Sequence, residues 1–192
     1  MTKLESNFRN MLLVLSGISL FAALALASVY TFTKEPIALS KIAKQQNAIK
    51  NVLPPFDHID ANPIEKAVGQ EVTKVYRAYA KDNSFVGSAV ETTTMRGYKG
   101  HVGIIVGFDK EGKIIDYFVL EQNETPGLGA KMVNWFKTDK GRQNILGKNP
   151  GVTFMTVNEV DAITAATISS KAFLGAIQNA YDAHSANIPE QK

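Results

Sequence analysis

Hydroxyl-bearing residues gather near the C-terminus of this 192-residue chain, in the segment DAITAATISS of residues 161–170. Its hydroxyls belong to Thr164, Thr167, Ser169 and Ser170. They stand where a final helix is expected to begin, so each is a candidate to cap the exposed backbone N–H groups there. The same N–H groups and the positive end of the helix dipole favour a phosphate. The residue types alone favour an ordinary helix cap, with a phosphate-linked site as the alternative.

The rest of the composition restricts the chemistry that the chain can support. The chain has no cysteine, which excludes thiolate-ligated iron–sulfur clusters, c-type haem attachment and disulfide exchange. Its net charge is only +3, with Lys and Arg scattered along the chain, so no nucleic-acid partner is expected. His58, His101 and His184 are far apart, and no metal site is predicted from their spacing. A redox role would therefore need a carrier held by other atoms.

The beginning of the hydroxyl-rich segment, DAITAAT, is similar to the flavinylation motif of the FMN-binding domain family. That motif reads Asp, two variable residues, Ser or Thr, usually Gly, then Ala and Thr. In the family the last threonine carries FMN through a phosphoester bond. The resemblance implies one covalent FMN per chain on Thr167, with the other motif residues, Asp161, Thr164, Ala165 and Ala166, also at the cofactor-binding site. Ala165 departs from the common pattern because it stands where glycine is usual.

A second block, ETPGLG at residues 124–129, is similar to a loop of the same family. The resemblance implies that this loop binds the cofactor through Glu124, Thr125, Gly127, Leu128 and Gly129. Both glycines can adopt positive φ and let the backbone approach a flat ring, so we expect Thr125 and Leu128 to contact the flavin. Two alternatives stay open: a tight turn without a ligand, and a Glu124 that caps a local amide instead of touching the cofactor.

The order of apolar segment, hairpin, loop and flavinylation turn resembles the G subunits of Rnf-type ion-translocating ferredoxin:NAD oxidoreductases, within the same family. This implies an electron carrier that works with other membrane subunits of such a complex and is not a complete enzyme alone. It also implies a maturation partner, a magnesium-dependent flavin transferase that takes FMN from FAD and releases AMP. Two other functions remain open, an unmodified anchor or assembly subunit and a membrane-attached FMN-binding sensor domain.

Residues 11–32 contain no charged residue and are long enough to span a bilayer. Lys3 and Arg9 precede this stretch, so the positive-inside rule places the N-terminus in the cytoplasm. We expect a single-pass protein of the bacterial inner membrane with its C-terminal domain on the extracytoplasmic (periplasmic) side. A cleaved signal peptide with a site near Ala27 is the alternative. The expected divisions are a cytoplasmic N-terminus (1–10), a transmembrane helix (11–33), a juxtamembrane helix (34–55) and an FMN-binding domain (56–192).

The domain itself shows strand patterns followed by helix patterns. Segments rich in β-branched and aromatic residues predict strands at 72–80, 84–94, 101–108, 113–121 and 153–157. A turn at 109–112 (DKEG) joins two of these strands in a hairpin. Helical spacing predicts a short helix beginning within 131–137 and a final helix over 168–184. The sequence therefore predicts an α+β domain, with an antiparallel sheet and flanking helices, after an N-terminal transmembrane helix.

Overall fold

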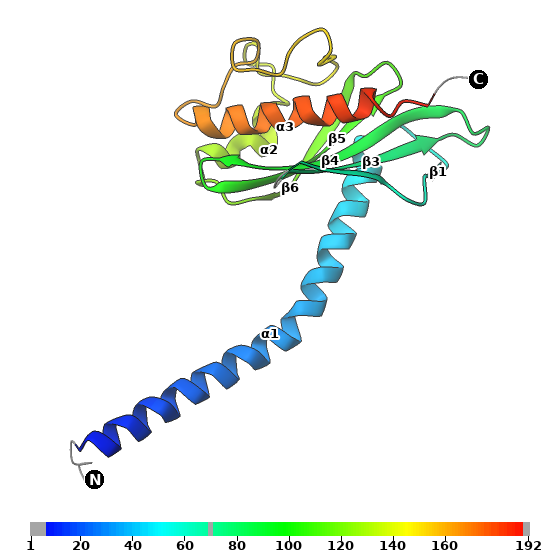
Figure 1. Ribbon diagram of the computed structural model, residues 1–192. Helices are drawn as coiled ribbons and strands as arrows, with labels where there is room; N and C mark the ends of the chain where they lie inside the picture. Colours follow the sequence, from blue (N-terminus) through cyan, green and yellow to red (C-terminus); the bar gives the residue numbers. More distant parts are fainter. Residues whose placement is uncertain (1–6, 69–70, 190–192) are drawn as a thin grey trace. The chain divides into compact units, whose positions relative to one another are not determined.

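The computed structural model describes residues 7–68 and 71–189, and it divides into two compact units, Met1–Lys44 and Gln45–Lys192. Helix α1 (Phe8–Val52) supplies the described part of the first unit and the start of the second (Figure 1). The two helical stretches expected before the domain thus form one helix, which ends just before the Pro54-Pro55 pair. Lys3, which contributed to the predicted orientation, lies outside the described residues.

The part of α1 in the first unit has the properties of a membrane span. It contains an apolar window long enough to cross a bilayer, and no part of that window is buried in the structure. The hydroxyls of Ser28, Thr31 and Thr33 each donate to the backbone carbonyl four residues earlier, at 2.8 Å. Such bonds satisfy polar side chains without water, which suits a helix in a lipid environment.

The second unit is built on a six-stranded antiparallel sheet (Figure 1). The strands are β1 (His58–Ile59), β2 (Ile64–Val68), β3 (Glu71–Tyr79), β4 (Phe85–Gly97), β5 (Gly100–Asp109) and β6 (Ile114–Gln122). Their order is β1-β3-β4-β5-β6, and β2 also pairs with β3. The predicted α+β class is confirmed. Four predicted strands are present as β3 to β6, and the DKEG turn joins β5 to β6.

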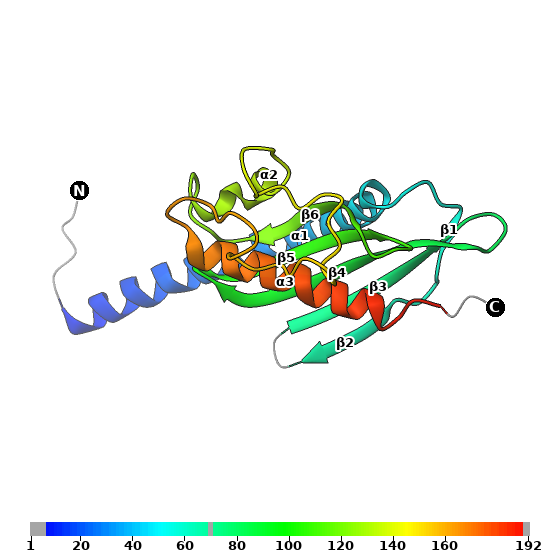
Figure 2. The ribbon, with the colours of Figure 1, turned by 90° about the horizontal axis from the view of Figure 1, so that it is seen from above.

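Three helical segments follow the sheet: η1 (Gly129–Lys131), α2 (Met132–Trp135) and α3 (Thr167–Ser185). Helix α3 lies across one face of the sheet and closes the larger core (Figure 2). Alternate residues of β5, such as Ile104, Val106 and Phe108, are fully buried on this side. Phe173 of α3 stacks on Phe136, with ring centroids 4.7 Å apart, so the helix and the segment after α2 share one aromatic contact.

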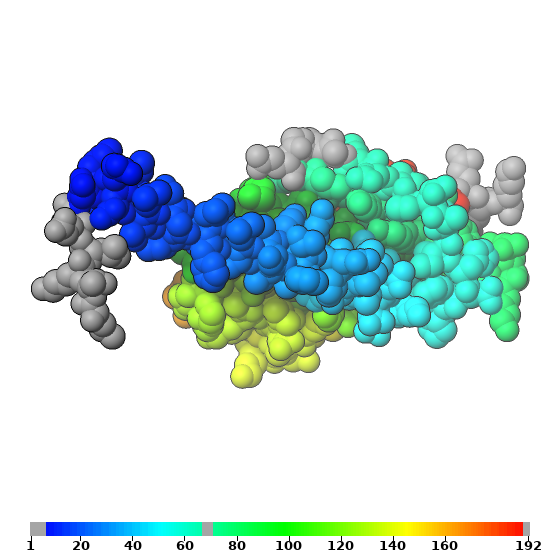
Figure 3. Space-filling view, turned by 90° about the horizontal axis from the view of Figure 1, so that it is seen from below, coloured from blue at the N-terminus to red at the C-terminus, as the bar shows by residue number. Residues whose placement is uncertain are grey.

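The opposite face of the sheet is covered by the last turns of α1, within the second unit (Figure 3). Ile49 and Val52 pack against Ala78, Ala89 and Ile105 in a second, smaller core. A side chain at Gly107 would collide with the backbone carbonyl of Val52. Only glycine therefore lets the helix end contact β5 so closely.

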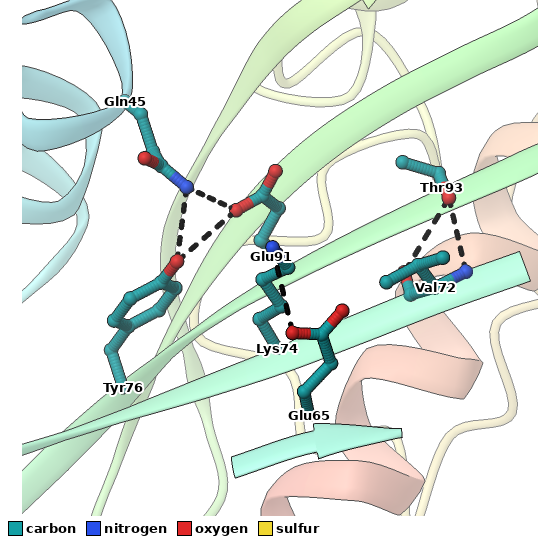
Figure 4. A network of polar contacts seen from close by, with 7 residues as sticks. All are labelled: Gln45, Glu65, Val72, Lys74, Tyr76, Glu91 and Thr93. Carbon is teal, nitrogen blue, oxygen red and sulfur yellow. Dashed lines mark hydrogen bonds and ion pairs between the residues drawn. The ribbon is translucent and has the colours of Figure 1, made fainter. Parts of the chain in front are cut away.

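A polar network lies beside this smaller core (Figure 4). The Gln45 amide donates to the Tyr76 hydroxyl at 3.0 Å and to the Glu91 carboxylate, and the Tyr76 hydroxyl lies 3.4 Å from the same carboxylate. Burial, and then the neighbouring Glu91 charge, raise the pKa of Tyr76 to about 12. The phenol therefore stays protonated and can donate to Glu91 at neutral pH.

One strand prediction is wrong. Residues 153–157 form irregular chain with bends and the start of a turn, not a strand. The backbone N–H of Met155 donates to the Gln178 side chain at 3.1 Å, and the N–H of Thr153 donates to the Asn149 carbonyl at 2.9 Å. These two backbone N–H groups therefore have acceptors without a neighbouring strand. The short strands β1 and β2 were not predicted.

Candidate cofactor site

The motif DAITAAT forms a tight turn that leads into α3, and its last residue, Thr167, begins the helix. The backbone N–H of Ala166 donates to the Ile163 carbonyl at 3.0 Å, which closes a β-turn with Thr164 and Ala165 at its centre. Ala165 has φ +60°. A positive φ at the third position of a turn is the geometry of a type II turn, which normally requires glycine. The turn explains why glycine is usual at this motif position, and here alanine accepts the strained conformation.

The first residue of the motif is fixed by contacts from an earlier loop. The Asp161 carboxylate accepts the backbone N–H of Arg142 at 2.8 Å and a guanidinium N–H of the same residue at 3.1 Å. The backbone hydrogen bond from Arg142, together with its guanidinium, holds the pKa of Asp161 below its usual range. Trp135 donates its indole N–H to the Asp161 carbonyl at 3.0 Å. Asp161 therefore anchors the turn to the rest of the domain.

The predicted capping role of the four hydroxyls is wrong. The residue before α3 is Ala166, and no side chain caps the helix. The Ser170 hydroxyl has another function: it accepts the Ile163 N–H at 2.9 Å and donates to the Ala166 carbonyl at 3.0 Å, which holds the turn together. The Ser169 hydroxyl donates to Glu124 instead. The two serines are occupied elsewhere, so they leave the first backbone N–H groups of α3 without a side-chain cap.

Thr164 and Thr167 are both exposed, and among the described residues neither hydroxyl has a hydrogen-bond partner. They differ in position, because Thr164 lies in the turn and Thr167 is the first residue of α3. A phosphate joined to Thr167 would lie beside uncapped N–H groups at the positive end of a 19-residue helix. The residues present at Thr167 therefore fit a phosphate ester.

The second motif forms a tight turn of its own. The backbone N–H of Leu128 donates to the Thr125 carbonyl at 3.1 Å, with Pro126 and Gly127 between them. Gly127 has φ +77° and open space around it, so the expected positive φ is confirmed there. Gly129 does not have a positive φ, so glycine is required there for a different reason. A Cβ at Gly129 would lie 2.5 Å from the Ser169 hydroxyl and 2.7 Å from Glu124.

The two motifs meet where Gly129 of the loop lies close to Ser169 of α3. The Ser169 hydroxyl donates to the Glu124 carboxylate at 2.8 Å, which joins the ETPGLG loop to the first turn of α3. Leu128 and Ile168 remain 40% and 54% exposed at this end of the helix. Thr125 is half-buried, and its carbonyl holds the loop turn. The loop and the hydroxyl-rich motif are thus brought together at the N-terminal end of α3.

The structure also adds residues that the motifs did not indicate. Trp135 and Arg142 hold Asp161, and the β4–β5 hairpin contributes Gly97 and the Lys99 backbone N–H beside Glu124. Trp135 was interpreted from the sequence as a core residue, and it is partly buried against the larger core. Its indole N–H could have signalled a second role, since a buried indole needs a hydrogen-bond acceptor.

Comparison with known proteins agrees with this geometry. Residues 97–182 match the model of the FMN-binding domain family, a range that begins in the β4–β5 hairpin and includes both motifs. Over 174 residues the chain is 34% identical to the G subunit of the Na(+)-translocating ferredoxin:NAD(+) oxidoreductase complex of Acetobacterium woodii, and the match covers 83% of each chain. Over 171 residues it is 31% identical to the G subunit of the ion-translocating oxidoreductase complex of Methanosarcina acetivorans, covering 86% of this chain and 88% of the relative.

A further relative, the G subunit of the ion-translocating oxidoreductase complex of Haemophilus influenzae, is 33% identical over 126 residues. That match covers 62% of this chain and 60% of the relative. The fold, the two motifs and the family match define an FMN-binding domain preceded by a helix long enough to span a membrane. The chain belongs to the family of G subunits of ion-translocating oxidoreductase complexes.

Proposed function

We propose that this chain is a membrane-anchored electron carrier that holds one FMN through a phosphoester bond to the Thr167 hydroxyl. When bound, the flavin supplies reversible uptake and release of electrons, which a chain without cysteine cannot supply through thiolate-bound centres. The chain would act as one subunit of an ion-translocating ferredoxin:NAD oxidoreductase complex, as the name of its Acetobacterium relative suggests. Its own residues bind and orient the cofactor.

The position of Thr167 is the observation that carries the proposal. Its exposed hydroxyl has no partner among the described residues, and it begins a helix whose first N–H groups lack a side-chain cap. Thr164, three residues earlier, is also exposed but lies in the turn, before the helix. Both threonines therefore offer a hydroxyl. Only Thr167 also has a helix N-terminus beside it to receive the phosphate.

Loading requires a flavin transferase, with FAD as the donor. The Thr167 oxygen forms a bond to the phosphorus on the FMN side of FAD, and the bond from that phosphorus to the bridging oxygen breaks. AMP is the leaving group, and the threonine proton passes to a base of the transferase. The chain's part is to present the hydroxyl on an ordered, accessible turn. The contacts of Asp161 with Arg142 and Trp135 contribute to that order.

The covalent bond also suits the compartment that we propose for the domain. With α1 as a single span and the N-terminus in the cytoplasm, the FMN-binding domain lies on the extracytoplasmic side of the inner membrane, where a dissociated cofactor would be lost by dilution. Protease added outside intact spheroplasts should digest the domain. Digestion only after the membrane is opened would contradict this orientation and leave the cofactor assignment standing.

The cofactor assignment is tested on a denaturing gel viewed under ultraviolet light, together with intact-protein mass. Wild-type chain co-expressed with the transferase should keep flavin fluorescence after denaturation and gain the mass of one FMN less one water. Thr167→Ala should lose both signals, and the matched control Thr164→Ala should retain both. A colourless wild-type chain with the mass of the bare polypeptide would exclude the carrier and leave an anchor or assembly subunit. Loaded protein that never purifies with an electron-transfer complex would indicate a sensor domain.

A further inference from the structure

Glu124 is a buried carboxylate where three segments of the chain meet. The residue is only 5% exposed. One oxygen accepts the Ser169 hydroxyl at 2.8 Å, and the other lies 3.4 Å from the backbone N–H of Lys99 in the β4–β5 hairpin. Its own backbone N–H donates to the Gln122 side chain at 2.6 Å. The residue thus connects the hairpin, the ETPGLG loop and helix α3.

Two glycines make room for this carboxylate. A Cβ at Gly97 would lie 2.5 Å from one Glu124 oxygen, and a Cβ at Gly129 would lie 2.7 Å from the other. The backbone of two different segments therefore closes around the side chain. Each oxygen faces a donor of the chain, the Ser169 hydroxyl or the Lys99 backbone N–H, as the alternative in which Glu124 caps a local amide expects.

Stability gives little reason for a carboxylate at this place. Among the described residues no Lys, Arg or His side chain forms an ion pair with Glu124. Burying a carboxylate without a cation is unfavourable, and its hydrogen bonds offset only part of that penalty. What the carboxylate does provide is geometry, because Ser169 lies two residues after Thr167 in the first turn of α3.

We propose that Glu124 is a positioning residue for flavin attachment: by holding Ser169 and the hairpin, it fixes the first turn of α3 so that the Thr167 hydroxyl is presented to the transferase. This inference rests on the proposed function of Thr167 and adds to it. Reaction rates depend steeply on the placement of the attacking atom, and a displacement of about 1 Å can reduce a rate on the order of a hundredfold. A loosened first turn would therefore slow attachment even where the domain remains folded.

The test measures how fast full-length chain, purified in detergent without prior loading, gains covalent fluorescence from FAD and transferase. Ser169→Ala removes one hydroxyl from the contact, and we expect the initial rate to fall on the order of tenfold or more. Glu124→Ala should have at least the same effect. Glu124→Gln keeps one acceptor but turns an N–H donor toward the other partner, so its rate should lie between those of wild type and Glu124→Ala.

The matched control is Ser88→Ala. Ser88 is also a buried serine bonded to a side chain of α3, with its hydroxyl 2.7 Å from His184 Nδ1. That contact lies 17 residues after Thr167, roughly 25 Å along the helix. Ser88→Ala should lower the melting temperature by an amount similar to Ser169→Ala and leave the initial loading rate as in wild type.

Hydrogen exchange on unloaded protein gives a second readout that does not need the cofactor. Ser169→Ala and Glu124→Gln should speed exchange in residues 125–131 and 166–171, whereas Ser88→Ala should not. If Ser169→Ala and Glu124→Gln load at the wild-type rate, or if Ser88→Ala slows loading as much as they do, the positioning role is wrong. If wild-type chain itself never gains covalent flavin, the proposed function fails before this inference is reached.

Discussion

The two ends of helix α3 use the same kind of contact in different surroundings. At the N-terminal end, the Ser169 hydroxyl is bonded to Glu124 at 2.8 Å while Thr167 stays exposed. At the C-terminal end, the Ser88 hydroxyl is 2.7 Å from His184, which is 1% exposed. The serine contact at the N-terminal end lies beside an exposed hydroxyl, and we call this the open end of α3. The serine contact at the C-terminal end lies against a buried ring, and we call this the closed end.

The closed end is built from aromatic packing. The His184 ring stacks on Phe108 with centroids 5.0 Å apart, and Phe85 and Tyr181 lie at 6.4 and 6.2 Å. Among the described residues its Nε2 is a buried atom without a hydrogen-bond partner, so the ring behaves as an apolar anchor that carries an unsatisfied polar atom. The difference teaches that one end of α3 is closed by aromatic packing, whereas the other leaves a hydroxyl accessible for chemistry.

The largest expected effect on stability comes from the middle of α3, whose packing supports both ends of the helix. Phe173 is fully buried and packs on Phe136 and Tyr117, with centroids at 4.7 and 5.0 Å. Phe173→Ala should lower the free energy of unfolding by about 3–5 kcal/mol, because it leaves a cavity in the larger core. Urea unfolding followed by far-ultraviolet circular dichroism measures the loss. The same substitution at Phe154, which is 63% exposed, should change stability by less than about 0.5 kcal/mol.

The next effect concerns the closed end alone and depends on pH. Burial lowers the pKa of His184 from its ordinary value of 6.5 to about 4, and the nearby Asp109 charge opposes this only in part. Below pH 6.5 the unfolded chain therefore binds a proton that the folded chain does not, so stability should fall as pH decreases from 6.5 to about 4 and then level off. The contribution of this histidine is roughly 3 kcal/mol over that range.

Urea unfolding at several pH values, for wild type and His184→Gln, checks this expectation. The variant should be less stable at neutral pH and should lose the part of the pH slope that His184 causes. A wild-type slope that persists unchanged in His184→Gln would show that another group titrates, and the closed end would then not be the acid-sensitive one.

Much of this architecture could be predicted from sequence because its signals are local. Strands β3 to β6 are rich in β-branched and aromatic residues, and α3 carries a helical apolar pattern over most of its length. The positive φ at Gly127 follows from a Pro-Gly pair, whose turn preference depends on two adjacent residues. Such features need no knowledge of distant segments.

The features that escaped prediction depend on contacts between segments far apart in the chain. The partner of Glu124 is Ser169, 45 residues later, and the carboxylate of Asp161 meets Arg142, 19 residues earlier. Residues 153–157 have the composition of a strand, but the Gln178 side chain takes up a backbone N–H there. Strand β1 has two residues, too few to show a period. Sequence patterns indicate buried faces and turns, but they do not show which side chain forms a hydrogen bond with a given polar group.

The smallest expected effect concerns the two turns at the open end, which place a different residue at the same strained position. Ala165 has φ +60° in the turn before α3, and Gly127 has φ +77° in the ETPGLG loop. Ala165→Gly should relieve a strain of about 1 kcal/mol, partly offset by the greater freedom of glycine in the unfolded chain, so stability should stay level or rise slightly. Gly127→Ala meets no steric obstacle but acquires the unfavourable φ, and should lose about 1 kcal/mol of stability.

The melting temperatures of the two variants measure these opposite effects on stability. A loss of stability in Ala165→Gly would mean that the alanine side chain contributes packing at this turn that outweighs its backbone strain.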